Sequence, residues 1–134
     1  MSFNISTKAV STTTFLHLLD PATDEKLYDV DADGNKSPVG INLYGKASAQ
    51  YRQALSQLSK KNLMRKNKPQ SFETNVDDNN EILVAISQSS NLNIDGVPVD
   101  NAKTFTKLYD EPSLFWVKEQ VQATLDDTAA FTQK

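Results

Sequence analysis

Hydrophobic and polar residues follow two different rhythms along the chain, and the rhythm changes between Leu43 and Lys68. Before this stretch, short apolar runs alternate with turn residues, which is typical of strands. After it, apolar residues recur mainly at intervals of three and four, a spacing that places them on one face of a helix. The sequence therefore predicts an α+β fold, with a small N-terminal antiparallel β-meander followed by about four α-helices in a partial bundle.

The predicted meander covers residues 15–45. Its first strand contains Phe15, Leu16, Leu18 and Leu19 and ends at Asp20-Pro21. A return strand is expected over residues 26–30, and a turn at residues 31–37 leads to a third strand that ends at Tyr44. Residues 1–14 are polar and rich in Ser and Thr, so we expect a flexible arm there, with an edge strand as the alternative.

Residues 46–134 form the predicted helical part. The first helix is capped by Ser48, ends before Pro69, and carries one apolar face made of Tyr51, Ala54, Leu55 and Leu58. A polar connection over residues 71–80, in which Asp77 and Asp78 suit a helix start, leads to a short buried helix over residues 82–86. A loop is expected from residue 87 to residue 99.

Two further helices are predicted in the C-terminal third. Asp100 is the expected cap of a helix that bears Phe105, Leu108 and Tyr109. Pro112 suits the first turn of the last helix, which is expected to continue to about Phe131. The last helix carries an apolar stripe, with two aromatic residues off its centre: the stripe is Leu114, Val117, Val121 and Leu125, and the aromatic residues are Phe115 and Trp116.

Length and composition limit the class of protein. A chain of 134 residues is expected to be a single domain, because it can bury most of its apolar surface in one core. It contains no cysteine, which excludes disulfides and thiolate metal sites within the sequence. No apolar run approaches the ~18 residues of a membrane span, and residues 1–14 lack the apolar core of a signal peptide. We therefore expect a soluble intracellular protein without a membrane partner.

The net charge of −3 conceals a strong partition along the chain. Residues 1–45 sum to −3, residues 46–68 to +7, residues 69–102 to −6, and residues 103–134 to −1. Opposite charges on adjacent segments favour internal pairing or a homo-oligomer. Nucleic acid is not an expected partner, because the basic cluster lacks interleaved aromatic residues. The cluster is either a solvated helix end or a contact for an acidic partner; it contains Lys60, Lys61, Arg65, Lys66 and Lys68.

The sequence offers little catalytic or metal-binding chemistry. Asp29, Asp31 and Asp33 precede Gly34 as in the first half of a calcium loop, but Gly40 stands where a bidentate glutamate would be needed. A hairpin turn rich in Asp and Gly explains the same residues. His17 is the single histidine, without an evident catalytic partner. We therefore expect no enzyme activity and no cofactor, with the three aspartates as a weak metal candidate.

Three phrases of the chain together resemble the small tail assembly chaperones of long-tailed bacteriophages. They are LHLLDPATDEKLYDVDADG, GINLYGKASAQYRQAL and LYDEPSLFWVKEQVQATLDD, and the resemblance extends over residues 15–131. It implies a non-enzymatic protein of the infected bacterial host's cytoplasm that binds the tape measure protein, keeps it soluble and helps the tail tube assemble around it. Members of that family often have a minor, longer form, made by ribosomal frameshifting, whose extra domain recruits the tail tube protein.

The resemblance brings no residue roles with it, so the candidate contacts come from the residues themselves. We expect apolar contact with the partner from Leu114, Phe115, Trp116 and Val121. The alternative for Phe115 and Trp116 is that they pack on the helices before them, since a bundle can bury more than one stripe. Electrostatic steering is expected from Lys60, Lys61, Arg65 and Lys66. The alternative function is a structural phage tail or connector component that is retained in the virion.

Overall fold

The computed structural model describes residues 4–64 and 72–132, in which a small sheet lies against four α-helices. The sheet contains β1 (Thr13–His17), β4 (Gly40–Tyr44) and β5 (Ser87–Ser90) in the order β1-β4-β5, and both pairings are antiparallel. The helices are α1 (Ala49–Met64), α2 (Phe72–Ile86), α3 (Ala102–Asp110) and α4 (Phe115–Asp126). The predicted α+β class is confirmed.

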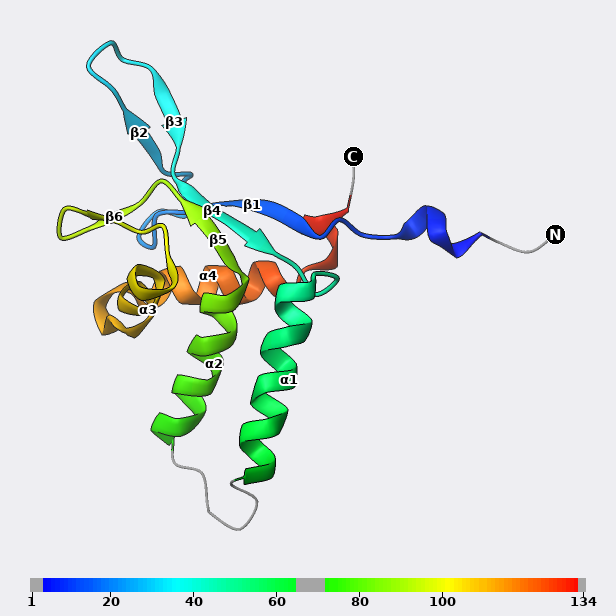
Figure 1. Ribbon diagram of the computed structural model, residues 1–134. Coiled ribbons are helices and arrows are strands. Elements are labelled where there is room, and N and C mark those ends of the chain that lie inside the picture. Colours follow the sequence, from blue (N-terminus) through cyan, green and yellow to red (C-terminus); the bar gives the residue numbers. More distant parts are fainter. Residues whose placement is uncertain (1–3, 65–71, 133–134) are drawn as a thin grey trace.

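Short elements complete the described chain. They are the 3-10 turns η1 (Ile5–Lys8), η2 (Pro112–Leu114) and η3 (Thr128–Phe131), and the hairpin strands β2 (Tyr28–Val30), β3 (Lys36–Pro38), β6 (Asn93–Ile94) and β7 (Val97–Pro98). The β2–β3 hairpin projects from one side of the sheet, and α1 and α2 run side by side away from the other (Figure 1). Residues 4–12 lie outside the sheet, and η1 is exposed.

The strand order of the predicted meander is wrong. β1 pairs directly with β4, while β2 and β3 pair only with each other. The predicted return segment pairs with the first predicted strand only through an isolated bridge between Leu19 and Lys26. The third strand of the sheet is β5, which lies in the segment predicted to be a loop. Its sequence, SQSS, contains no apolar residue, so it lacks the alternation that marks a strand.

Helix positions were predicted better than helix ends. Ser48 caps α1, as expected, because its Oγ accepts the backbone N–H of Tyr51 at 3.1 Å. The cap of α3 is Asn101 rather than Asp100, since the Asn101 side chain accepts the Thr104 N–H at 3.0 Å. The predicted polar connection at residues 71–80 is wrong, because α2 already begins at Phe72. The last helix ends at Asp126, five residues earlier than predicted.

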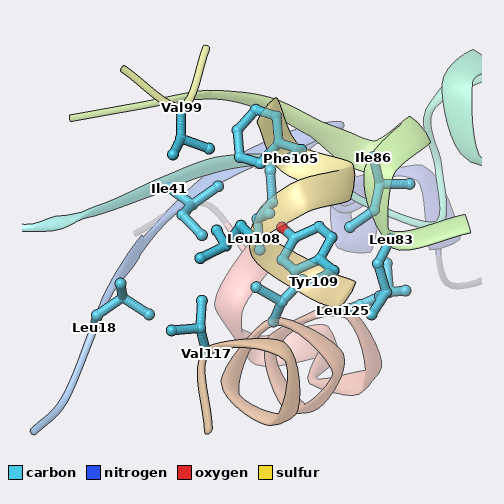
Figure 2. Close-up of a cluster of buried hydrophobic side chains, with 12 residues drawn as sticks. Leu18, Ile41, Leu83, Ile86, Val99, Phe105, Leu108, Tyr109, Val117 and Leu125 are labelled. Carbon is cyan, nitrogen blue, oxygen red and sulfur yellow. The ribbon is translucent and has the colours of Figure 1, made fainter. Parts of the chain in front are cut away.

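The core lies where α3 meets the sheet, α2 and α4. Phe105, Leu108 and Tyr109 project from α3 into the middle of the cluster (Figure 2). Side chains from every neighbouring element surround them: Leu18, Ile41, Leu43, Leu83, Ile86, Val99, Val117, Val121 and Leu125. By contrast, α1 buries no residue fully and contacts the rest mainly through α2. The α1–α2 pair is thus an extension of the core.

Candidate docking surface

An aromatic side chain stands out at the start of α4. Phe115 is 56% exposed, the largest exposure among the large hydrophobic residues that the structure describes between residues 72 and 132. Its position follows from the turn before it: the Glu111 carboxylate accepts the N–H and the hydroxyl of Ser113, at 3.3 and 2.9 Å. Pro112 fits this first turn because it has no N–H to satisfy. Since Val117 faces the core, Phe115, two positions earlier, faces outward.

Phe115 separates two hollows on this surface. The first, here called the α4 groove, is lined by Pro21, Asp24, Phe115, Trp116, Glu119, Gln120 and Ala123. The second has a volume of about 470 Å³ and is lined by Val76, Asp77, Asn80, Tyr109, Asp110, Glu111, Pro112, Phe115 and Lys118. A third hollow shares Asp77, Asn80 and Asp110 with the second and adds Glu81, Val84 and Thr106. We call the second and third hollows together the α2–α3 trough.

A clamp between distant parts of the chain builds the floor of the α4 groove. The Gln120 side-chain oxygen accepts the Leu19 N–H at 2.8 Å, and its nitrogen donates to the Leu19 carbonyl oxygen at 2.9 Å. This pair of hydrogen bonds holds the turn that contains Pro21 and Asp24 against α4. Gln120 was not among the predicted site residues, because no local pattern marks an amide that pairs with a backbone 101 residues away.

The predicted apolar contacts divide into surface and core. Phe115 is exposed, as the contact hypothesis requires. Trp116 and Leu114 are partly buried and pack against the core cluster, so each is only partly accessible. Val121 is 0% exposed. Its choice as a contact residue is therefore wrong: it lies on the same helical stripe as Val117 and Leu125, and that stripe faces the core.

Two of the four predicted basic contacts, Lys60 and Lys61, lie on α1. Lys60 is exposed, whereas Lys61 is partly buried and forms an ion pair and hydrogen bond with Glu81 of α2. Arg65 and Lys66 lie outside the described residues. The Lys61–Glu81 pair shows that part of the charge partition in the sequence is used internally, between neighbouring helices.

Negative charge dominates the α2–α3 trough. Asp77, Glu81, Asp110 and Glu111 lie along it, and Lys118 is the one cationic residue among those lining it. Glu81 is paired with Lys61, and Asp110 accepts a hydrogen bond from the Asn80 amide nitrogen at 2.9 Å. Within the described residues, Asp77 has neither an ion pair nor a side-chain hydrogen bond.

The Asn80 side chain is buried, yet one of its polar atoms lacks a hydrogen-bond partner within the described residues. The residue is 5% exposed, and its Oδ1 has no hydrogen-bond partner within the described part of the chain. Leaving a buried acceptor unsatisfied costs about 1–3 kcal/mol. Asn80 lines both hollows of the trough, together with Asp77 and Asp110.

Two titratable groups have perturbed pKa values. Burial raises the pKa of Tyr109 to about 12, and the hydrogen bond with Ser87, at 2.5 Å, offsets only part of that effect. The pKa of Asp126 is lowered, chiefly by the hydrogen bond from Gln122 and then by Lys46, whose Nζ lies 3.1 Å away. Tyr109 forms part of the wall of the trough, whereas Asp126 lies at the other end of α4.

The candidate metal loop has a structural role. The Asp31 carboxylate accepts the backbone N–H groups of Asp33 and Asn35, both at 2.9 Å, and thereby closes the turn between β2 and β3. No group of three or more His, Asp or Glu side chains within the described residues is placed to hold a metal ion. His17 Nε2 lies 2.7 Å from the Leu27 carbonyl oxygen, and the His17 ring packs edge-on against Tyr28.

Comparisons with protein families, with characterised proteins and with solved structures found no match to the chain. None of the helices in residues 4–64 and 72–132 is both long and apolar enough to cross a membrane. The function must therefore be inferred from the surface of the chain itself, where Phe115 stands between the α4 groove and the α2–α3 trough.

Proposed function

We propose that this protein is a non-enzymatic phage tail assembly chaperone that binds a helical segment of the tape measure protein across Phe115. The observation that supports this proposal is the exposed Phe115 between two hollows. An amphipathic helix binds to an apolar surface of this kind through the large apolar side chains of one of its faces. The phrases that resemble the tail assembly chaperones supply the identity of the partner.

The proposal requires the apolar contact to be strong enough to matter. Full burial of a Phe side chain is worth about 1.5–3 kcal/mol relative to leaving it exposed. Phe115 is already partly covered, so a partner that buries the rest would gain about half of that amount. This gain corresponds to roughly a tenfold change in affinity. This single contact is smaller than the ~2 kcal/mol of a typical hot-spot residue, so the contacts around Phe115 must contribute as well.

The place of action and the longer form follow from the same proposal. A chaperone of this kind works in the cytoplasm of the infected bacterial host, before the tape measure protein is enclosed by the tail tube. A minor frameshifted form would extend the chain and recruit the tail tube protein. Expression of the natural gene with its downstream DNA, followed by mass spectrometry of N-terminally tagged products, tests for that form.

Co-expression tests the main proposal. The full chain and the tape measure protein are produced together, and the soluble tape measure protein captured with the chain is measured. We expect Phe115→Ala to reduce the captured amount about tenfold while the chain stays folded. Ile5→Ala is the matched control, because Ile5 is 74% exposed on η1, far from α4 (Figure 1). Equal capture by both variants would refute the role of Phe115.

A structural component of the tail or connector is the other candidate function. The feature that favours it is the β2–β3 hairpin, which projects from the body with every strand residue exposed. A two-stranded hairpin is only marginally stable alone in water, so a contact in a larger assembly would stabilise it. Recovery of the chain at stoichiometric copy number in purified particles would support this function over a transient chaperone.

A further inference from the structure

The α2–α3 trough combines two features that a surface without a ligand seldom retains. It is strongly acidic, with four carboxylate residues and one lysine along its lining. It also contains Asn80, whose buried Oδ1 lacks a donor. Native proteins leave few buried polar atoms unsatisfied, and such an atom often marks a place where a donor binds. Both features call for the same kind of ligand, a cationic hydrogen-bond donor.

We infer that the α2–α3 trough binds the cationic head of a lysine or arginine side chain from a helix whose apolar face rests on Phe115. This inference rests on the proposed function, because the bound helix is the partner that Phe115 contacts. The partner would be a basic amphipathic helix. The lysine or arginine and the apolar side chain would lie about one turn apart, because Phe115 and Asp77 line the same hollow.

The chemistry of the trough fits a long cationic side chain. The aliphatic stem of a lysine can lie along Val84 and the aliphatic part of Thr106, while its ammonium group reaches Asp77 and Asp110. The ammonium has three donors and can share them among several acceptors. The Asn80 oxygen is covered in the free chain, so a bound donor reaches it after a small turn of the amide. Asp77 is available for the contact, since the described residues include no partner for it.

The acidic lining also favours a basic partner over an acidic one. Lys118 and Lys61 offset only part of the four carboxylates, and the rim of the α4 groove adds Asp24 and Glu119. Complementary charge raises the rate of encounter and excludes partners of the wrong sign, while exposed pairs add little affinity. The trough would thus select among apolar helices that all fit Phe115 equally well.

Peptide binding tests the inference with the full chain. The probe is a fluorescent amphipathic helical peptide of roughly 20 residues, long enough to be helical, with leucines on one face and a lysine one turn away. A second peptide has glutamine in place of that lysine. The chain is used as wild type, as Asp77→Asn, and as Asp33→Asn. The last variant removes the same charge from the exposed β2–β3 turn.

We expect Asp77→Asn to weaken binding of the lysine peptide about twofold to fivefold, as for one partly screened ion pair. Asp33→Asn should leave the affinity for the lysine peptide unchanged, and the glutamine peptide should bind all three chains with equal affinity. The side-chain amide resonances of Asn80 should shift when the lysine peptide binds and move less with the glutamine peptide. Equal effects of the two variants, equal binding of the two peptides, or unmoved Asn80 resonances would each overturn the inference.

Two further outcomes separate this inference from neighbouring ideas. If the wild-type chain self-associates without peptide and Asp77→Asn abolishes that association, the trough binds a second copy and the inference is wrong. If the peptides behave as expected but the tape measure protein is not captured, the proposed function fails while the cation site stands. If capture succeeds and is insensitive to Asp77→Asn, the proposed function stands without the cation site.

Discussion

Replacing Tyr109 with Phe should change how the stability of the protein depends on pH. Tyr109 is 3% exposed, and burial raises its pKa to about 12, from 10.0 for a free tyrosine. Below about pH 10, both the folded and the unfolded chain keep the phenol proton, so the free energy of unfolding does not depend on this group. Between about pH 10 and pH 12, only the unfolded chain loses the proton. Stability therefore falls as the pH rises through this window.

The size of the loss follows from the two pKa values. At about pH 11, the unfolded state gains roughly 1 kcal/mol from ionisation that the folded state does not gain. Tyr109→Phe has no phenol to ionise, so its free energy of unfolding does not fall in this way. It also lacks the hydrogen bond with Ser87, which should make it about 1 kcal/mol less stable than wild type at about pH 9. The difference between the two chains should therefore nearly vanish at about pH 11.

Urea unfolding of both chains at about pH 9 and about pH 11 measures this change. Tyr28→Phe is the control, because Tyr28 is 48% exposed on β2 and this variant keeps the buried Tyr109 phenol. If the gap between wild type and Tyr109→Phe is the same at both pH values, the phenol is not shielded in the folded state and the reasoning is refuted.

Two other substitutions probe the packing around the site. Gly40→Ala should destabilise the protein by more than about 2 kcal/mol in urea unfolding, because a Cβ at Gly40 would overlap the Leu16 carbonyl oxygen on β1. A loss of stability below about 0.5 kcal/mol would contradict the close approach of β1 and β4. Trp116→Ala should lower the midpoint of thermal unfolding by several degrees, since Trp116 packs against the core. Phe115→Ala should leave the midpoint nearly unchanged, because Phe115 is exposed. Equal midpoints for the two variants would place both rings on the surface.

The elements with a continuous apolar stripe were predictable from sequence. In α3, Phe105, Leu108 and Tyr109 recur at helical spacing, and all three are buried as that spacing requires. In α4, the same rule placed Val117 and Leu125 in the core. It applies equally to Val121, which shows why this residue could not also serve as a surface contact.

The missed elements depend on partners that are far away in sequence. β5 consists of polar residues and is a strand because β4 presents an unpaired edge to it, and the Asn42 amide reaches Ser89 Oγ at 2.9 Å. α2 packs against α1, which is itself largely exposed, as well as against α3, so its apolar pattern does not follow the core alone. Neither the pairing of β5 nor the packing of α2 can be inferred from the local sequence pattern.

Only part of the candidate site was predictable, because the rest depends on contacts between segments that are distant in sequence. The position of Phe115 off the stripe of α4 marked it as a candidate contact but left its burial open, and the structure shows it exposed. The acidic trough was not predictable, because it forms only when α2 and the end of α3 lie together. Asn80 appeared in a segment predicted to be a connection, and no sequence signal distinguishes an amide with a satisfied oxygen from one without.

The Gln120–Leu19 clamp has a consequence for the order in which the chain folds. It closes a separation of 101 residues, and the Ser11 N–H donates to the Phe131 carbonyl oxygen across an even larger one. Contacts of such long range slow folding, because the entropy of closing the loop is lost before the contact is gained. On the ribosome, β1 and β4 can pair early, but Leu18 and Ile41 lack most of their core until α3 and α4 are synthesised. The chain thus spends most of its own synthesis with its apolar side chains uncovered.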